Sequence, residues 1–362
     1  MQTLLRLLLK CQHRRNRSGP TQTDKGMTLV ELLVGAIMAF LIITPMLGFV
    51  VDMLNTDRRE QVKSNTEQDV QAALDFIAQD LSQAIYIYDN RAINGPPGPN
   101  EQLVGPQLPP NANGTPILVF WKRKQINDAV SVDTNPNTRV LPNNCTQNTC
   151  NDTYTRSLVA YYQVRENNPN SIWCQPAGGP CPTRIERYEI SEGIMENPAA
   201  TTAATRYFDN AEAKDGQRHS AAFNLDFDWN KPTENVTNPA GFTDASFTGS
   251  NPQVLVNYID QSPLVTAPPN DECQRALGNP RAQVPGTTGT SPVLDTTLKI
   301  SNPDNTNSFY ACVDTSKNIA RVTIRGNSLR RLQANDTAYN PNKSAYFPTA
   351  SVQVQGLGAR GQ

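Results

Sequence analysis

Residues 27–54 read MTLVELLVGAIMAFLIITPMLGFVVDML, and Glu31 is the only ionisable side chain between positions 27 and 51. A helix rises about 1.5 Å per residue, so the segment from 27 to 51 would extend about 37 Å. The hydrocarbon core of a bilayer is about 30 Å thick. The stretch therefore predicts a transmembrane helix near the start of this 362-residue chain.

The segment before this stretch is strongly basic. Residues 1–26 contain six Lys or Arg residues and one acidic residue, although the whole chain is nearly balanced, with 32 basic and 33 acidic residues. Because basic residues stay on the cytoplasmic side, the pattern predicts a cytoplasmic N-terminus and an exported C-terminal part. The apolar run is too long for a secretory signal peptide, and no A-x-A-like cleavage site closes it. A plain signal anchor fits the length but gives no reason for Glu31, and a buried core helix would not need the basic leader.

Glu31 is unusual because a carboxylate in hydrocarbon is costly unless it is paired. The hexapeptide GMTLVE at positions 26–31 resembles the class III signal of type IV prepilins. The resemblance implies that a membrane-bound prepilin peptidase cleaves after Gly26 and N-methylates Met27, which leaves Glu31 at position five of the mature chain. The family usually has Phe where this chain has Met27. Pro45, inside the apolar run, also matches the family.

The resemblance implies an assembly role for Glu31. Inside the membrane, the Glu31 carboxylate of one subunit would neutralise the Met27 amine of its neighbour and set the register of subunits in a filament. Pro45 lacks a backbone N–H and clashes with the preceding turn, so a kink or local unwinding is predicted there.

The helical pattern continues past the membrane. Apolar residues recur mostly at steps of three and four from Val62 to Tyr88, with polar positions between them, including Asp80. This pattern predicts an amphipathic helix with one buried face, so that one helix would cover 27–88 and end before the turn-rich NGPPGPN at 94–100. In pilins, the second half of such a helix packs on an antiparallel sheet of the exported head. A free-standing coiled coil over 57–88 is the alternative.

The predicted fold class is α+β and pilin-like: a long N-terminal helix packed on an antiparallel β-sheet head domain with long loops. The predicted organisation is a removed leader at 1–26, a transmembrane helix at 27–53, an amphipathic continuation at 54–90 and a β-rich head at 91–362. Strands are predicted at 115–123, 157–165, 184–191, 222–229, 253–260, 309–313 and 318–325. Long loops rich in Asn, Pro, Gly and Thr are predicted at 89–114, 128–155, 230–251 and 262–297. Their lengths exceed the usual range, so we interpret them as functional or mobile.

Seven cysteines need an explanation, and Cys11 lies in the predicted leader. The other six are Cys145, Cys150, Cys174, Cys181, Cys273 and Cys312. An even number in an exported domain predicts three disulfides, although many pairings satisfy that number. Short separations favour Cys145–Cys150 and Cys174–Cys181, which leaves Cys273–Cys312. A zinc site is the weaker alternative, because the spacings are not C-x2-C and the predicted compartment is oxidising.

No catalytic constellation is evident, so we predict that the protein is not an enzyme and has no cofactor or metal. GLGARG at 356–361 matches a nucleotide-binding glycine pattern, but only Gln362 follows where a helix is required. His219 is the sole histidine of the predicted mature chain, and we interpret it as a surface residue rather than as part of a triad with Ser220. Weak calcium candidates, which a solvated surface explains as well, are Asn224, Asp226, Asp228 and Asp304. Aromatic residues that core or rim packing explains better than sugar binding are Tyr161, Tyr162, Trp173 and Trp229.

Composition narrows the function further. The formal net charge of -1 argues against nucleic-acid binding, and the two histidines exclude multi-His metal sites. The large, loop-rich head resembles that of PilW-type minor pilins and of J-type pseudopilins of type II secretion. The segment SFYACVDTSKNIARVTIRGNSLRRL at 308–332 resembles cyanobacterial pseudopilins linked to hormogonium polysaccharide secretion.

These resemblances imply a structural subunit of a pilus-like or secretion filament that supports polysaccharide secretion and gliding motility. The implied partners are other pilin or pseudopilin subunits, the prepilin peptidase, and an inner-membrane assembly platform with its cytoplasmic ATPase. The implied location is the inner membrane, with a periplasmic or extracellular head. Since the tip-most subunits often lack the position-five glutamate, Glu31 predicts a place beneath another subunit. Two alternatives are a pilin-anchored adhesin that binds glycan and a signal-anchored extracytoplasmic enzyme.

Overall fold

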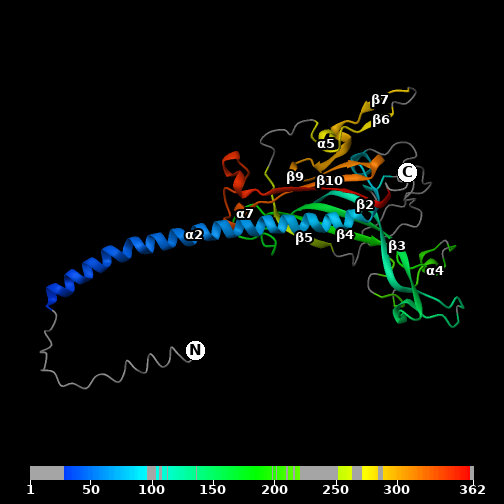
Figure 1. The fold of residues 1–362 in the computed structure, drawn as a ribbon, viewed down its shortest axis with the longest axis horizontal. Helices are drawn as coiled ribbons and strands as arrows, with labels where there is room; N and C mark the ends of the chain where they lie inside the picture. Colours follow the sequence, from blue (N-terminus) through cyan, green and yellow to red (C-terminus); the bar gives the residue numbers. More distant parts are fainter. Residues whose placement is uncertain are drawn as a thin grey trace, which may run out of the picture. The chain divides into compact units, whose positions relative to one another are not determined.

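A computed structural model gives the fold of this chain (Figure 1). It describes residues 28–95, 103–105, 108–111, 113–135, 137–197, 199–200, 202–208, 211–214, 217–220, 252–262, 271–283 and 288–358. Two compact units are distinguished, residues 1–58 and residues 59–362. The predicted strand at 222–229 and the predicted loop at 230–251 lie outside the described residues.

Helix α2 covers Leu29–Ser82, 54 residues in all. Its second half buries one face, formed by Thr66, Val70, Ala73, Leu74, Ile77, Asp80 and Leu81. The predicted helix over 27–88, and with it the predicted amphipathic segment at 54–90, is wrong at its C-terminal end, because Ala84–Ile87 forms strand β1. This short segment reads Ala-Ile-Tyr-Ile, and its β-branched and aromatic residues suit a strand. It pairs with the next strand instead of prolonging the helix.

The first sheet has five antiparallel strands that follow one another in chain order (Figure 1). They are β1, β2 (Gly114–Ser131), β3 (Cys150–Arg165), β4 (Thr183–Ser191) and β5 (Gln253–Ile259). Strands β2 and β3 are longer than predicted and pair as far as Ser131 opposite Cys150. The predicted loop at 128–155 is therefore wrong at both ends, because the backbone hydrogen bonds of the hairpin continue beyond its apolar part.

The second sheet has four antiparallel strands in the order β11-β10-β9-β8. Their bounds are β8 (Lys299–Asn302), β9 (Asn305–Asp314), β10 (Ile319–Arg325) and β11 (Thr349–Gln355). The pattern at 309–313 and 318–325 predicts β9 and β10, whereas β8 and β11 carry too few large apolar residues to stand out. A small hairpin adds β6 (Arg281–Gln283) and β7 (Thr290–Pro292) inside the predicted loop at 262–297.

Short helices fill parts of the remaining connections. They are α3 (Asn90–Asn94), α4 (Ala203–Arg206), α5 (Glu272–Ala276), α6 (Asp295–Leu298) and α7 (Ser328–Leu332). Three 3-10 turns are η2 (Pro142–Asn144), η4 (Thr315–Lys317) and η5 (Pro341–Tyr346). The chain is thus α+β with two main antiparallel sheets, where a single sheet was predicted.

One hydrophobic core joins the second half of α2 to both main sheets. Ile77 and Leu81 of the helix are fully buried in it, together with Phe120 of β2 and Phe309 of β9. Gly326, directly after β10, permits this packing, because a Cβ atom there would lie 2.8 Å from the Thr66 side chain. The helix is therefore a structural part of the head domain and not a free coiled coil over 57–88.

The two sheets are also linked by an ion pair. Asp260, which follows β5 and is fully buried, accepts hydrogen bonds from Arg325 at the end of β10, with an Nε–Oδ2 distance of 2.8 Å. The other carboxylate oxygen of Asp260 accepts from the backbone and the hydroxyl of Ser262. A buried charge with this many partners keeps the two sheet ends in register.

Three disulfides staple the head. The bonded pairs are Cys145–Cys150, Cys174–Cys181 and Cys273–Cys312. The first two are the pairs that the short separations favour, and the third is the pair that they leave. The first closes the tip of the β2–β3 hairpin, the second closes a loop before β4, and the third fastens α5 to β9.

Candidate functional site

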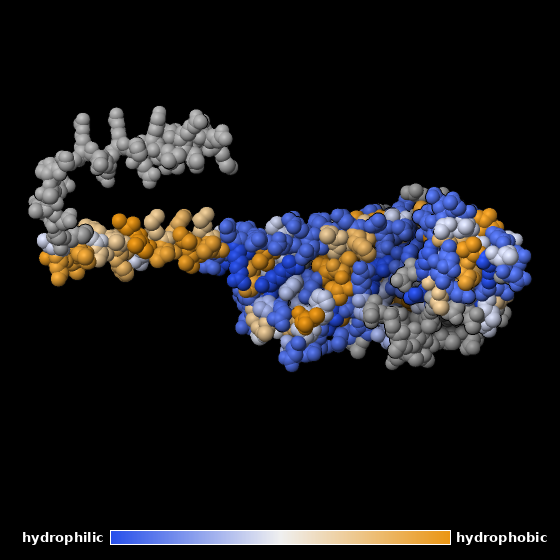
Figure 2. Space-filling view, turned by 90° about the horizontal axis from the view of Figure 1, so that it is seen from below, coloured by the Kyte–Doolittle hydropathy of each residue, from blue (hydrophilic) through white to orange (hydrophobic). Residues whose placement is uncertain are grey.

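The first half of α2 exposes its apolar side chains. Exposed fractions of the large apolar residues from Leu29 to Leu54 range from 48% at Val50 to 84% at Leu29. Figure 2 shows these residues as a continuous hydrophobic stretch on the face in view, in contrast to the largely hydrophilic head. By length and composition, α2 is the one candidate membrane span among the residues that the structure describes.

Glu31 lies in the first turn of this exposed helix. Thr28 precedes the helix and caps it, because the Glu31 backbone N–H lies 3.4 Å from the Thr28 hydroxyl and 3.0 Å from its carbonyl oxygen. The sequence Thr-Leu-Val-Glu at 28–31 is the pattern of a capping box, in which an acidic residue suits the positive end of the helix dipole. Within the described part of the chain, the Glu31 carboxylate has no ion-pair partner.

Pro45 lies inside α2, and the helix continues through it without interruption. Local unwinding, one of the two predicted alternatives, does not occur there, and the kink stays a prediction. The hydroxyl of the preceding Thr44 donates to the Phe40 carbonyl oxygen at 2.8 Å, which satisfies one acceptor in the turn before the proline. The predicted cleavage and methylation positions, Gly26 and Met27, lie outside the described residues.

The second half of α2 carries an acid of a different kind. Asp80 was assigned to the polar positions of the helix, but this is wrong, because Asp80 is 7% exposed. Its Oδ1 lies 3.1 Å from Lys122 Nζ on β2, and its Oδ2 lies 2.7 Å from Arg187 Nε on β4. The Tyr161 hydroxyl of β3 donates to the same Oδ2 at 2.7 Å. One carboxylate thus joins the helix to three strands.

Glu189 on β4 completes this Asp80 cluster. It accepts from Arg187 Nη2 at 2.6 Å, and its other oxygen lies 3.4 Å from Lys122 Nζ. Burial alone would raise the pKa of Glu189, but Arg187 and Lys122 outweigh burial and hold it at about 2. Burial beside Asp80 raises the pKa of the Tyr161 hydroxyl well above its usual range. The cluster therefore joins Lys122 and Arg187 to the carboxyl groups of Asp80 and Glu189.

Sequence reasoning missed the Asp80 cluster, although one signal for it exists. Asp80 falls between Ile77 and Leu81 within the apolar stripe of the helix, where an acid requires a buried partner. The partners come from three strands far apart in the chain, so no local pattern identifies them. The cluster positions the second half of the helix on the head through contacts to three strands.

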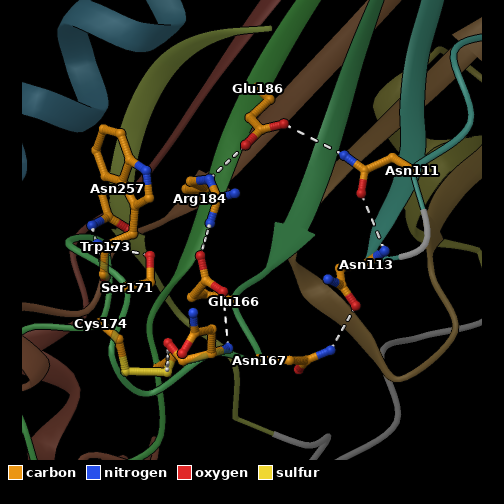
Figure 3. A network of polar contacts seen from close by, with 12 residues as sticks. Asn111, Asn113, Glu166, Asn167, Ser171, Trp173, Cys174, Arg184, Glu186 and Asn257 are labelled. Atoms are coloured by element: carbon orange, nitrogen blue, oxygen red, sulfur yellow. Dashed lines mark hydrogen bonds and ion pairs between the residues drawn. A yellow bond between two sulfur atoms is a disulfide. The ribbon is translucent and has the colours of Figure 1, made fainter.

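A second polar network surrounds the loop closed by Cys174–Cys181 (Figure 3). Arg184 donates to Glu186 at 2.6 Å and to Glu166 at 3.2 Å, so this arginine links β4 to the start of the loop. Figure 3 shows Asn111, Asn113 and Asn167 continuing the network from Glu186 along a chain of amide contacts.

The same loop is held from the C-terminal side. Arg330 of α7 is 1% exposed and donates to the carbonyl oxygens of Pro176 and Pro180 at 2.7 and 2.6 Å. Asn257 of β5 lies with its amide nitrogen 3.4 Å from the Trp173 carbonyl oxygen. With partners on both sides and a disulfide across it, the loop is a rigid structural feature.

The aromatic residues considered for sugar binding separate into two groups. Tyr161 and Tyr162 are buried in the core, whereas Trp173 is half-buried beside Arg184, with 5.7 Å between the guanidinium carbon and the ring centroid. Trp229 lies outside the described residues, as do Asn224, Asp226 and Asp228. The tyrosines therefore belong to the core, as the preferred interpretation of the sequence holds.

His219 is packed rather than exposed at the surface, contrary to the prediction. Its ring stacks on Tyr207 with centroids 4.1 Å apart, and Nδ1 lies 2.8 Å from the Glu192 carbonyl oxygen. Burial lowers the pKa of the imidazole. The neighbouring Ser220 uses its backbone N–H to bond the Ser191 carbonyl oxygen, which continues the strand pairing. These contacts describe a structural histidine.

No group of three or more His, Cys, Asp or Glu side chains is placed to hold a metal ion in the part of the chain that the structure describes. Asp304 follows β8 in an exposed turn, where its backbone N–H donates to the Asn302 side chain. The glycines at 356 and 358 pack against Ala84 and Ile85 near β1. A Cβ atom at either glycine would approach a backbone oxygen within 2.4 Å, so close packing explains these two glycines.

Comparison with known proteins adds no relative. No family model, no curated protein and no solved structure matches this chain.

Proposed function

We propose that this chain is a minor pilin-like subunit, or pseudopilin, of a type IV pilus-like or type II secretion-like filament. One observation carries the proposal: Glu31 is the sole ionisable residue between positions 27 and 51 of an exposed apolar helical stretch, and it ends the GMTLVE signal at the spacing of a prepilin. A plain membrane anchor has no use for an acid at this depth.

The proposed maturation begins at the membrane. Prepilin peptidase removes residues 1–26 by cleavage between Gly26 and Met27 and methylates the new amine of Met27. The apolar first half of α2 holds the subunit in the inner membrane, with its N-terminus on the cytoplasmic side and its head outside. Three disulfides suit a head domain in an oxidising compartment.

The proposed assembly step transfers the helix from lipid into the filament. An inner-membrane platform, driven by a cytoplasmic ATPase, would extract the subunit, and the helices of neighbouring subunits would then cover the exposed apolar side chains. Glu31 would pair with the Met27 amine of the next subunit, where the low dielectric makes an ion pair strong. Because the chain keeps this glutamate, we place it beneath another subunit in the filament.

Features of the head domain support a more specific kind of pilin-like subunit. Its size and its stapled loops fit the resemblance to PilW-type and J-type subunits, and the segment 308–332 supports a role in polysaccharide secretion and gliding motility. The core shared by the second half of α2 and both sheets would fix this part of the helix to the head.

The decisive experiment determines the N-terminus and intact mass of the protein from its native cells, with and without prepilin peptidase. We expect a chain that begins at N-methylated Met27 and that keeps residues 1–26 when the peptidase is absent. A chain that keeps residues 1–26 in both cells would contradict the proposal. The anchored-enzyme alternative would then remain, with the head to be screened for catalysis.

A further inference from the structure

A small pocket of about 260 Å³ lies on the outer face of the four-stranded sheet, next to α5. In β9 and β10, alternate residues such as Phe309 and Val322 point into the core. The residues between them point outward and line the pocket. The lining includes Tyr310 and Cys312 of β9, Arg321 and Thr323 of β10, and Glu272 and Arg275 of α5.

The wall of the pocket is fixed to its floor. The disulfide Cys273–Cys312 joins α5 directly to β9. Asp295 accepts hydrogen bonds from the backbone N–H groups of Cys273 and Gln274 at 2.7 and 3.0 Å. The pocket is therefore held in one shape before any ligand arrives, which lowers the entropic cost of binding.

The acids around the pocket already have partners. Glu272 accepts from the Tyr310 hydroxyl at 2.5 Å through one oxygen, and its other oxygen lies 2.9 Å from Lys299 Nζ. Asp271 pairs with Arg275 at 3.3 Å, and both side chains are more than half exposed, so solvent weakens this pair.

Arg321 is a further cation of the pocket, and it interacts with Glu272 only from beyond ion-pair distance. Its Nη2 donates to the Ser351 hydroxyl at 3.1 Å, and it has no carboxylate at ion-pair distance among the residues that the structure describes. A guanidinium has five N–H donors in a planar fork that fits a carboxylate or sulfate. The fork lines a preformed pocket with a second arginine, Arg275, at the solvent-exposed edge.

We propose that this Arg321 pocket binds a small ligand with one anionic group and neighbouring hydroxyls, of the sugar-acid class. Arg321 would hold the anionic group, and Arg275 would add a second charge at the mouth. The Thr323 hydroxyl donates to Tyr310, and its oxygen can still accept a hydrogen bond from a ligand hydroxyl. The volume falls just below the range of drug-sized sites, about 300–1,000 Å³, and so suits a single sugar-acid residue.

The test uses the full chain in detergent micelles and isothermal titration calorimetry at low ionic strength, with three probes. D-Galacturonate is expected to bind saturably, whereas neutral D-galactose is not. Inorganic sulfate, used as a competitor, distinguishes a site for any small anion from a site that also recognises the sugar hydroxyls. If sulfate competes at similar affinity, the site takes any small anion, and if it does not, the sugar hydroxyls contribute. Absence of saturable binding for both anions would overturn the proposal.

Two variants locate the site. Arg321→Gln should weaken galacturonate affinity about tenfold or more, because a hydrogen bond to a charged group contributes about 1.5–3 kcal/mol and about 1.4 kcal/mol is tenfold. Arg275→Gln, at an exposed position, should weaken it about threefold. The matched control Arg123→Gln removes an exposed arginine from β2, in the other sheet, and should leave affinity unchanged.

Equal losses of galacturonate affinity in Arg123→Gln and Arg321→Gln would indicate a general electrostatic attraction and would contradict a binding site at Arg321. Thermal unfolding of each variant shows whether it folds. If Arg321→Gln does not fold, unchanged affinity in Arg275→Gln would overturn the proposal on its own.

Discussion

From Leu29 to Leu54, helix α2 exposes large apolar side chains along its whole length, whereas from Thr66 to Leu81 it buries one face in the head domain. Each part also contains an acid in apolar surroundings. Asp80 is satisfied within the chain by a lysine, an arginine and a tyrosine. The Glu31 carboxylate has no ion pair among the described residues, although it lies in a segment apolar enough for a membrane.

The comparison shows that the second half of α2 serves the fold of the head, whereas the first half presents its side chains to other molecules. Backbone hydrogen bonds alone make both halves helical, so the secondary structure does not distinguish them. The side chains do, because the second half meets its apolar and polar requirements internally. The first half requires lipid or other subunits to cover its apolar surface and a partner for its acid.

The largest effect on the second half is expected from Asp80→Ala. The change leaves Lys122 and Arg187 buried with one carboxylate fewer, which should lower the free energy of unfolding by about 3–5 kcal/mol. Urea unfolding of the full chain in detergent, without reductant, measures it. Asp75→Ala is the matched control, because Asp75 lies on the exposed side of the same helix and should change stability by less than about 0.5 kcal/mol. Similar losses of stability in both variants would show that the buried contacts of Asp80 do not stabilise the fold more than an exposed acid does.

A second experiment compares one residue type in both halves. Ile77→Ala empties a fully buried position and should cost about 3 kcal/mol of head stability, since it leaves a cavity in the core. Ile43 is 53% exposed, and Ile43→Ala should leave the unfolding of the head unchanged within about 0.5 kcal/mol. Urea unfolding monitored by tryptophan fluorescence gives both values. An equal loss of head stability in Ile43→Ala would mean that the first half of α2 also stabilises the head. The contrast between the two halves would then be contradicted.

Local patterns predict much of this fold. The apolar run and the three- to four-residue spacing predict α2, and runs rich in β-branched and aromatic residues predict β2, β3, β4, β5, β9 and β10. The failures lie where local and tertiary signals compete. Ala84–Ile87 continues the helical spacing of α2 and also has the composition of a strand, and only its pairing with β2 decides between them. Strand β11 reads TASVQVQ, in which Val352 and Val354 are the only large apolar residues.

The candidate sites also differ in whether the sequence alone predicts them. Glu31 stands out in the sequence because everything around it is apolar. The Asp80 cluster and the Arg321 pocket depend on residues that only sheet topology brings together, such as Asp80 with Arg187 and Glu272 with Tyr310. No spacing in the sequence encodes those pairs, since strand register and the path of the loops determine them.

The smallest effect on stability, and the most informative for function, is expected from Glu31→Ala. Glu31 contacts nothing in the core, so head unfolding should stay within about 0.5 kcal/mol of wild type. Cleavage at Gly26 should also persist, because the apolar run and the basic leader are intact. Incorporation into filaments should nevertheless fall about tenfold or more, since an unpaired Met27 amine would remain in a low-dielectric interior.

Quantitative mass spectrometry measures the amount of the protein in sheared filaments relative to the amount in membranes. Asp52→Ala, at the far end of the apolar stretch, serves as the control and should incorporate normally. If Glu31→Ala incorporates as well as the control, the acid does not pair between subunits, and its role reduces to a favourable negative charge in the first turn of α2.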